Sequence, residues 1–260
     1  MPFSNAELED LARAKRLLET PGIAMRLSSL VGTPVEKGLA MLPDPARRAV
    51  HAATQKALQG ALSLAARSLG EAPRARSSDR MHKVAVATSG AIGGAFGLAS
   101  LAVELPISTG LILRSIADIA ASEGENPRHL DTRLACLTVF ALGSPTDRRD
   151  DAAESGYFAA RAALAGAVSE AAKHLAQKGL TKGGGPALAR LVGLITARFG
   201  IVVSEKAAAQ LVPVIGAAGG ALINTIFIGH YQDMARGHFI VRRLEKTHGA
   251  GPVREAYDRL

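Results

Sequence analysis

The chain contains a single cysteine, Cys136, among its 260 residues. One thiol cannot form an internal disulfide framework, and it excludes zinc sites built from several cysteines. We therefore expect a reducing compartment, and we expect Cys136 to be a small core residue because it lies in the apolar stretch RLACLTVF. The first residues are acidic and amphipathic, which predicts no secretory signal.

Aromatic residues are also scarce. They make up 4% of the chain, and tryptophan is absent, so the stacking platforms of single-strand nucleic-acid binders are lacking. Zinc-finger spacings and aromatic RNA-binding motifs are absent as well. We expect no nucleic-acid partner.

Motifs of nucleophilic and nucleotide chemistry are missing too. The chain has no Gly-x-Ser-x-Gly sequence and no Gly-Lys dipeptide, which excludes a serine-nucleophile elbow and a P-loop. The glycine-rich run at 90–97 lies inside a helical pattern and does not follow a strand, so a dinucleotide fingerprint is not expected either. These absences favour a protein that is not an enzyme and has no cofactor.

What the chain has in excess is positive charge. Lys and Arg outnumber Asp and Glu by 31 to 23, which gives a net charge of +8 and favours acidic partners. Basic residues concentrate at 67–83 and 236–246, next to the two most apolar segments. Such clusters form either a solvated surface or a contact with an anionic membrane.

Helix signals recur along the chain and strand signals do not, so the sequence predicts an all-α helical bundle. Ser4 with Glu7 forms a capping box, Thr33-Pro34 with Glu36 forms another, and Asp44-Pro45 begins a third long pattern. The stretch at 71–79 reads as a polar linker, which divides the chain into an N-terminal helical lobe at 1–76 and a main bundle at 77–260, both within one continuous unit. The predicted helices are 44–69, 80–104, 107–122, 128–142, 147–178, 187–199 and 204–248, the last of them kinked near Pro213.

Two segments, 84–103 and 207–229, carry no charged residue and are rich in Gly and Ala. Each is long enough to cross a bilayer, but Gly and Ala gain little free energy on insertion, so we expect them to pack in the protein. Helical spacing of small residues lets two backbones approach closely. We therefore expect the segments to form a central helix pair that crosses on the glycines Gly90, Gly93, Gly94, Gly97, Gly216 and Gly220.

Three blocks carry a resemblance to a known family. ELPISTGLILRSIADIA at 104–120, ESGYFAARAAL at 154–164 and VSEKAAAQLVPVIGAAGGALINTIFIGHYQDMARGHFIVRRLE at 203–245 resemble the EcsC family of bacterial proteins. The resemblance implies a helical protein that is cytoplasmic or peripheral at the inner membrane, with an ABC transporter as a candidate partner. It implies no catalytic residues. Its signature positions here are Glu104, Pro106, Arg114, Asp118, Tyr157, Arg161, Glu205, Lys206, Pro213, Gly216, Asn224 and His230.

Several polar residues interrupt apolar helices and are candidates for a site. We expect Arg114 and Asp118 to form an intrahelical ion pair, Glu205 to complement the dipole at the start of the last helix, and buried Asn224 to bond a facing helix. The candidate polar network consists of Glu104, Arg114, Asp118, Asn224 and His230.

His230, Asp233 and Glu104 are weak metal candidates. His238 lies two turns beyond His230, too far for one ion to bind His230, Asp233 and His238 without ligands from elsewhere, such as Glu104 or Asp118. Without a metal, we expect His230 to be a satisfied core residue and His238 to be solvated.

Two hypotheses about function follow. The first is a non-enzymatic, membrane-associated accessory protein whose basic residues face anionic headgroups. The second is an enzyme or a carrier of a hydrophobic or other small ligand, with a polar pocket between bundle helices. The oligomeric state is not specified by the sequence.

Overall fold

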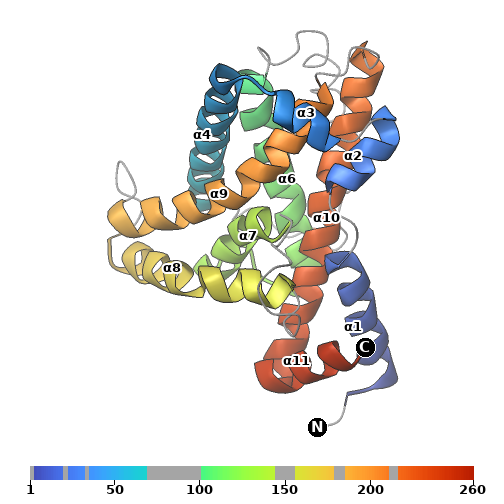
Figure 1. Cartoon of the computed structure of the whole chain (residues 1–260). Coiled ribbons are helices and arrows are strands. Elements are labelled where there is room, and N and C mark those ends of the chain that lie inside the picture. Colours follow the sequence, from blue (N-terminus) through green and yellow to red (C-terminus); the bar gives the residue numbers. More distant parts are fainter. Residues whose placement is uncertain are drawn as a thin grey trace.

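The computed structural model describes residues 3–19, 23–32, 35–68, 101–143, 156–178, 185–210 and 216–260. These residues form ten helices and no strand, which confirms the predicted all-α bundle (Figure 1). The helices are α1 (Asn5–Leu18), α2 (Ile23–Val31), α3 (Val35–Met41), α4 (Asp44–Ser68), α6 (Leu101–Ser122), α7 (Leu130–Leu142), α8 (Gly156–Lys178), α9 (Gly185–Gln210), α10 (Gly216–His248) and α11 (Ala250–Arg259).

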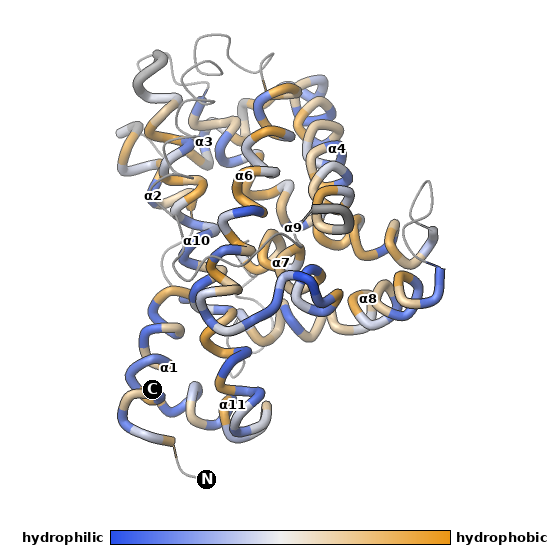
Figure 2. The backbone as a smooth tube through the Cα atoms, turned by 180° about the vertical axis from the view of Figure 1, so that it is seen from behind, coloured by the Kyte–Doolittle hydropathy of each residue, from blue (hydrophilic) through white to orange (hydrophobic). Residues whose placement is uncertain are grey.

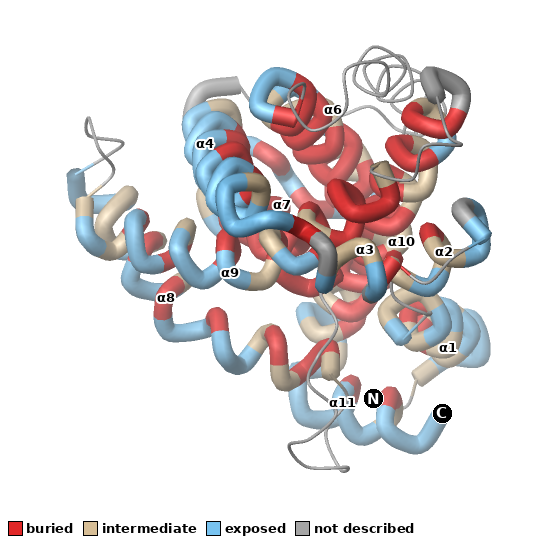
Figure 3. The backbone as a smooth tube through the Cα atoms, turned by 45° about the horizontal axis from the view of Figure 1, so that its top comes forward, coloured by how far each residue is buried: buried red, intermediate tan, exposed pale blue. Residues whose placement is uncertain are grey.

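The longest helix, α10, runs through the centre of the bundle. Its 33 residues span about 50 Å at 1.5 Å per residue. It contacts α1, α2, α6, α7, α9 and α11, and buried residues line the helices around it (Figure 3). α10 therefore packs against most of the other helices that the structure describes.

An aromatic cluster joins α7, α9 and α10 at the core. Tyr231 of α10 lies 5.3 Å from Phe140, 5.6 Å from Phe199 and 5.3 Å from Phe227, measured between ring centroids. All four rings are fully buried. Aromatic pairs at such distances contribute about 0.5–1.5 kcal/mol each beyond the area that they bury. Four of the ten aromatic residues of the chain thus lie where these three helices meet.

Helices α2, α3 and α4 share this core, and α1 packs against α10 in a second buried cluster. Ile23, Leu27 and Leu58 belong to the same buried cluster as Ile112 and Phe227, and α4 packs against both α6 and α9. The N-terminal helices that the structure describes are therefore an integral layer of the bundle. The predicted linker at 71–79 and nearly all of the predicted helix at 80–104 lie outside the described residues.

Two predicted helix starts are confirmed. The Ser4 Oγ accepts from the Glu7 backbone N–H at 3.3 Å, and the Glu7 carboxylate accepts from the Ser4 backbone N–H at 2.8 Å, which is a complete capping box. Asp44 is the first residue of α4. Thr33 and Pro34, which form the second predicted capping signal, lie outside the described residues.

Other predicted boundaries are wrong. α6 runs from Leu101 through Pro106, where a break was expected. Pro106 has no backbone N–H, so the carbonyl of Ala102, one turn earlier, loses its helical hydrogen bond. Ala102 is exposed, and water can therefore donate to that carbonyl. The predicted break at 200–204 is absent as well, because Val202 and Val203 are fully buried in an uninterrupted α9 and this burial outweighs their low helix propensity.

The longer α9 changes the position of Glu205 and Lys206. Both residues lie near the C-terminal end of α9 and are buried, so the expected role of Glu205 at a helix N-terminus is wrong. α11, after Gly249, was not predicted from the sequence. Gly249 has a φ of 86°, which favours glycine and separates α10 from α11.

Four of the six glycines that were predicted to form the helix crossing lie outside the described residues. These are Gly90, Gly93, Gly94 and Gly97, whereas Gly216 begins α10 and Gly220 is buried within it. The close approaches that the structure describes involve other glycines. A Cβ on Gly237 of α10 would lie 2.6 Å from the Leu18 Cγ and 3.1 Å from the Ala14 carbonyl oxygen of α1.

Candidate functional site

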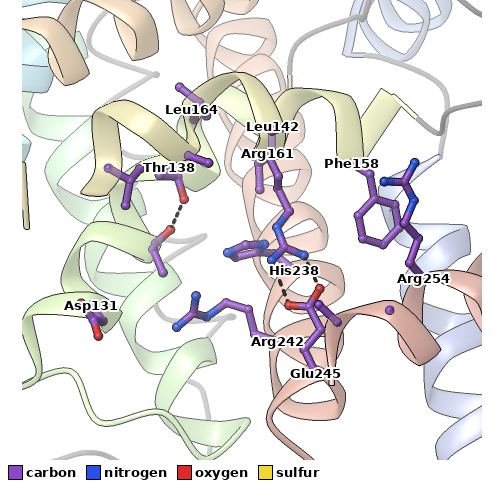
Figure 4. Close-up of a pocket in the computed structure, with 16 residues that line it drawn as sticks. Asp131, Thr138, Leu142, Phe158, Arg161, Leu164, His238, Arg242, Glu245 and Arg254 are labelled. Atoms are coloured by element: carbon purple, nitrogen blue, oxygen red, sulfur yellow. Dashed lines mark hydrogen bonds and ion pairs between the residues drawn. The ribbon is translucent and has the colours of Figure 1, made fainter. Parts of the chain in front are cut away.

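A cavity of about 560 Å³ lies between α7, α8, α10 and α11 (Figure 4). Its lining is charged on one side and apolar on the other. The charged residues are Asp131, Arg161, Arg242, Glu245 and Arg254, and the apolar wall includes Leu142, Leu164 and Val168. A cavity of this size and mixed lining has the character of a small-molecule site.

Helix periodicity places the polar side chains together. Tyr157 and Arg161 are four residues apart on α8, and His238, Arg242 and Glu245 recur at intervals of four and three on α10. Residues at these spacings share one helix face. The two faces meet, so five polar side chains from two helices converge at one place.

An ion pair joins the two faces. Arg161 donates from Nη1 and Nη2 to the two oxygens of Glu245 at 2.8 and 2.9 Å, and Nη1 also donates to the Tyr157 hydroxyl at 3.2 Å. Burial by itself would lower the pKa of Arg161, but the hydrogen bonds with Glu245 and the interaction with Tyr157 outweigh it and raise the pKa. Arg161 is therefore a fixed cation whose charge Glu245 balances.

His238 lies behind this pair. It is 3% exposed, and its Nδ1 is 2.9 Å from the Tyr157 hydroxyl oxygen. Burial lowers the pKa of His238 well below its usual value, and the charges of Arg161 and Arg242 act in the same direction. The expectation of a solvated His238 is wrong, because α8 covers this side of α10, a tertiary contact that helix spacing alone does not reveal.

Arg242 extends from α10 toward α7 (Figure 4). Its Nε donates to Glu125 Oε1 at 3.1 Å, and the same carboxylate accepts from Lys246 at 2.7 Å and from Thr132 at 2.8 Å. Burial tends to raise the pKa of Glu125, but the bonds with Lys246, Thr132 and Arg242 outweigh it and lower the pKa. One carboxylate thus serves two cations, and among the residues that line the cavity three arginines stand against two carboxylates, those of Asp131 and Glu245.

A second buried charge pair lies elsewhere in the bundle. Lys206 of α9 donates to Glu104 of α6 at 2.5 Å, and the two side chains are 0% and 3% exposed. Gln210 donates to the other Glu104 oxygen at 3.4 Å, and the Lys206 ammonium lies 4.7 Å from the centre of the Phe227 ring. Burial lowers the pKa of Lys206, and Glu104 opposes that change.

Glu104 and His230, two members of the predicted polar network, have different hydrogen-bond partners. His230 is buried, and its Nε2 lies 2.7 Å from the Gly143 carbonyl oxygen; because a carbonyl can only accept, Nε2 carries the hydrogen. Burial lowers the pKa of His230 to about 4. Arg114 is exposed on α6, Asp118 is half-buried and Asn224 is fully buried on α10. The described contacts thus place Glu104 and His230 in two different hydrogen-bonded groups, and the Arg114–Asp118 ion pair stays a prediction.

The metal candidates have other partners. Glu104 is paired with Lys206, and Asp233 accepts from Arg26 of α2 at 3.1 Å. In the described parts of the chain, no group of three or more His, Cys, Asp or Glu side chains could hold a metal ion. Cys136 is buried in the core, as expected, and burial raises the pKa of its thiol.

Sequence reasoning missed most of the residues that line the cavity. Tyr157 and Arg161 were noted only for their resemblance to a family, whereas Arg242, Glu245 and Arg254 were not singled out. The signal that could have found them is the interval of three and four residues that links His238, Arg242 and Glu245. This interval identifies the cavity residues only together with the position of α8, which faces α10.

Comparison with known proteins gives one result. The chain matches the EcsC protein family over residues 5–244. No curated protein and no solved structure matches it. The matched region contains Arg161, His238 and Arg242, whereas Glu245 and the α11 wall of the cavity follow it. Because the match covers nearly the whole chain, this protein belongs to the EcsC protein family.

Proposed function

We propose that this protein is a non-enzymatic accessory protein that binds peripherally to the cytoplasmic face of an anionic membrane. The observation that carries the proposal is the convergence of the described parts of the two charge-free segments at one end of the bundle. The described part of the first segment, residues 101–103, begins α6, and the described parts of the second lie at the end of α9 and in the first half of α10.

The geometry of α6 and α10 supports this convergence. Ser115 accepts from Gln232 at 2.8 Å and Glu123 accepts from Arg243 at 3.1 Å, so the two helices run parallel. Ile107 and Leu222 lie about 12 and 15 Å before the first of these contacts at 1.5 Å per residue. They are therefore at the same end of the helix pair.

Large apolar side chains are exposed at this end. Val103 is 67% exposed, and Ile107 and Leu222 are 51% exposed. Figure 2 shows long hydrophobic stretches along α6, α9 and α10 and more hydrophilic residues along α1 and α11. α6 and α9 are long and apolar enough to cross a membrane by length and composition alone, yet 56% and 44% of their apolar windows are buried. This partial burial favours contact with a membrane surface over insertion.

Basic residues flank the same end. Gly38 of α3 contacts Ala208 near the end of α9, and the adjacent Lys37 is exposed. Arg47, at the start of α4, is exposed and donates to the Leu42 carbonyl that follows α3. Each basic residue close to an anionic surface contributes about 1 kcal/mol of attraction. Apolar contact and charge attraction would therefore act together.

Vesicle co-sedimentation tests the proposal. The full chain should sediment with vesicles that contain phosphatidylglycerol and much less with phosphatidylcholine vesicles, and the difference should shrink between about 50 mM and about 500 mM salt because salt screens exposed charges. Ile107→Ser with Leu222→Ser should weaken binding by about tenfold, since two half-exposed apolar side chains no longer enter the interface.

The matched control is Leu194→Ser on α9, which changes another exposed apolar residue, 38% exposed and more than ten residues from Lys206. It should leave sedimentation unchanged. Equal binding to both kinds of vesicle, or an equal loss in the Leu194 variant, would contradict the proposed surface.

A further inference from the structure

We propose that the cavity between α7, α8, α10 and α11 binds a small amphiphile that has one anionic oxygen head group, a carboxylate or a phosphate, and an apolar body. The head group lies on the side of Arg242 and His238, and the body lies along the wall formed by Leu142, Leu164 and Val168. This site is distinct from the membrane-binding end, and the proposal does not depend on that function.

The first step concerns the proton on His238. Arg161 can only donate, so the Tyr157 oxygen accepts from it at 3.2 Å. The buried Tyr157 hydroxyl then has its own proton to donate, and His238 Nδ1 at 2.9 Å is the acceptor. In a neutral imidazole whose Nδ1 accepts, the hydrogen is on Nε2. His238 is therefore a neutral donor through Nε2.

This donor is unsatisfied in the part of the chain that the structure describes. The Nε2 atom of His238 is buried and has no hydrogen-bond partner, while the ring lines the cavity. A buried donor without an acceptor is costly, and native proteins rarely keep one. A ligand oxygen, either directly or through one water molecule, would satisfy it.

The second step concerns charge. Glu245 balances Arg161 through two hydrogen bonds, but Glu125 is shared by Arg242 and Lys246. Arg242 uses Nε for Glu125, and no described residue accepts from its terminal nitrogens, which can therefore donate to another acceptor. Guanidinium groups bind carboxylate and phosphate through paired N–H groups. The residues that line the cavity include three arginines and two carboxylates, those of Asp131 and Glu245, and this excess of one cation favours a ligand with one negative charge.

The third step concerns the rest of the ligand. Ala135 and Ala165 leave space beside Leu164 and Val168, and the Thr138 hydroxyl in this wall already donates to the Ala135 carbonyl at 2.8 Å. The wall therefore offers few polar partners to a sugar or a nucleotide. A volume of about 560 Å³ is sufficient for an apolar body in addition to the head group.

Titration calorimetry on the full chain tests the proposal with dodecanoate, dodecyl phosphate, dodecanol and acetate, all below the micellar range. At least one of the two anionic amphiphiles should bind, and the anion that binds identifies the head group. Dodecanol should bind to the wild type at least about tenfold more weakly than that anion does. The same anion should bind to the Arg242→Gln variant at least about tenfold more weakly than to the wild type.

The control Arg190→Gln removes a charge of the same kind from a surface pair with Glu170, where the arginine is 64% exposed, and should leave affinity unchanged. Ala165→Phe fills the apolar side without altering any ion pair, and it should weaken dodecanoate binding even if Arg242→Gln does not fold. ¹⁵N NMR should show a neutral His238 with its hydrogen on Nε2, and this signal should move when the ligand binds.

Three results would overturn the proposal. Equal affinity for dodecanol and for both anions would indicate an apolar crevice without head-group recognition. An equal loss of affinity in the Arg190 and Arg242 variants would indicate nonspecific charge attraction. The absence of binding by both anionic amphiphiles at about millimolar concentration, where even weak complexes form, would show that the cavity is not a ligand site.

Discussion

Replacing Lys206 with methionine should leave the Glu104 carboxylate buried without its cation. Both side chains are almost fully inaccessible to solvent, and methionine fills a similar volume without a charge. Removal of one partner of a buried ion pair costs about 3–5 kcal/mol, because the remaining charge is neither solvated nor paired. Against a total stability of about 5–15 kcal/mol for a typical domain, such a loss is large.

Urea unfolding followed by circular dichroism measures this loss of stability. The double variant Glu104→Gln with Lys206→Met serves as the control, because it removes both charges and should recover most of the stability. A loss below about 1 kcal/mol in Lys206→Met would refute the reasoning. So would a double variant as unstable as the single one.

Two further predictions concern other parts of the fold. Gly237→Ala should destabilise the protein by about 1–3 kcal/mol in thermal unfolding, because its Cβ would meet Leu18 and the Ala14 backbone. Gly193→Ala is the control: its Cβ would meet nothing within 4 Å, so it should stabilise the protein by about 0.5–1 kcal/mol. Hydrogen bonds from His248 and Ser4 lower the pKa of Glu7 to about 2, so Glu7 stabilises the folded state above pH 4.5 and loses that contribution as pH falls toward 2. The difference in melting temperature between the wild type and Glu7→Gln should therefore shrink on acidification, and a constant difference would argue against this pair.

The local features of the fold were predictable because their causes are local. The Ser4–Glu7 capping box involves residues three apart, and the start of α4 at Asp44 follows from the same kind of signal. Boundaries failed where tertiary burial outweighed local preference, as at Val202 and Val203 within α9. The missed α11 has few apolar residues, and it forms because Val253 and Tyr257 are buried against α1 and α10.

The candidate sites were less predictable because their partners are distant in sequence. Glu104 and Lys206 were both noted as signature positions, but their pairing joins residues 102 positions apart and depends on how α6 meets α9. Tyr157 and His238 are 81 positions apart. Helix periodicity assigns a residue to a face, but it does not say which face lies opposite. The residues that carry the cavity could be identified only after α8 and α10 were in place.

The two proposed activities lie at different levels of one helix. Phe227 of α10 lies beside the Lys206–Glu104 pair near the apolar end, and His238 to Glu245 line the cavity about 17–27 Å further along, at 1.5 Å per residue. An uninterrupted helix connects them, so any change of α10 that ligand binding favours would reach both ends. If the bound ligand changes the affinity of the protein for the membrane by some factor, thermodynamic linkage requires that membrane binding change the affinity of the protein for the ligand by the same factor. If the two sites are energetically independent, both factors equal one, and α10 then acts as a rigid spacer between a surface contact and a ligand cavity.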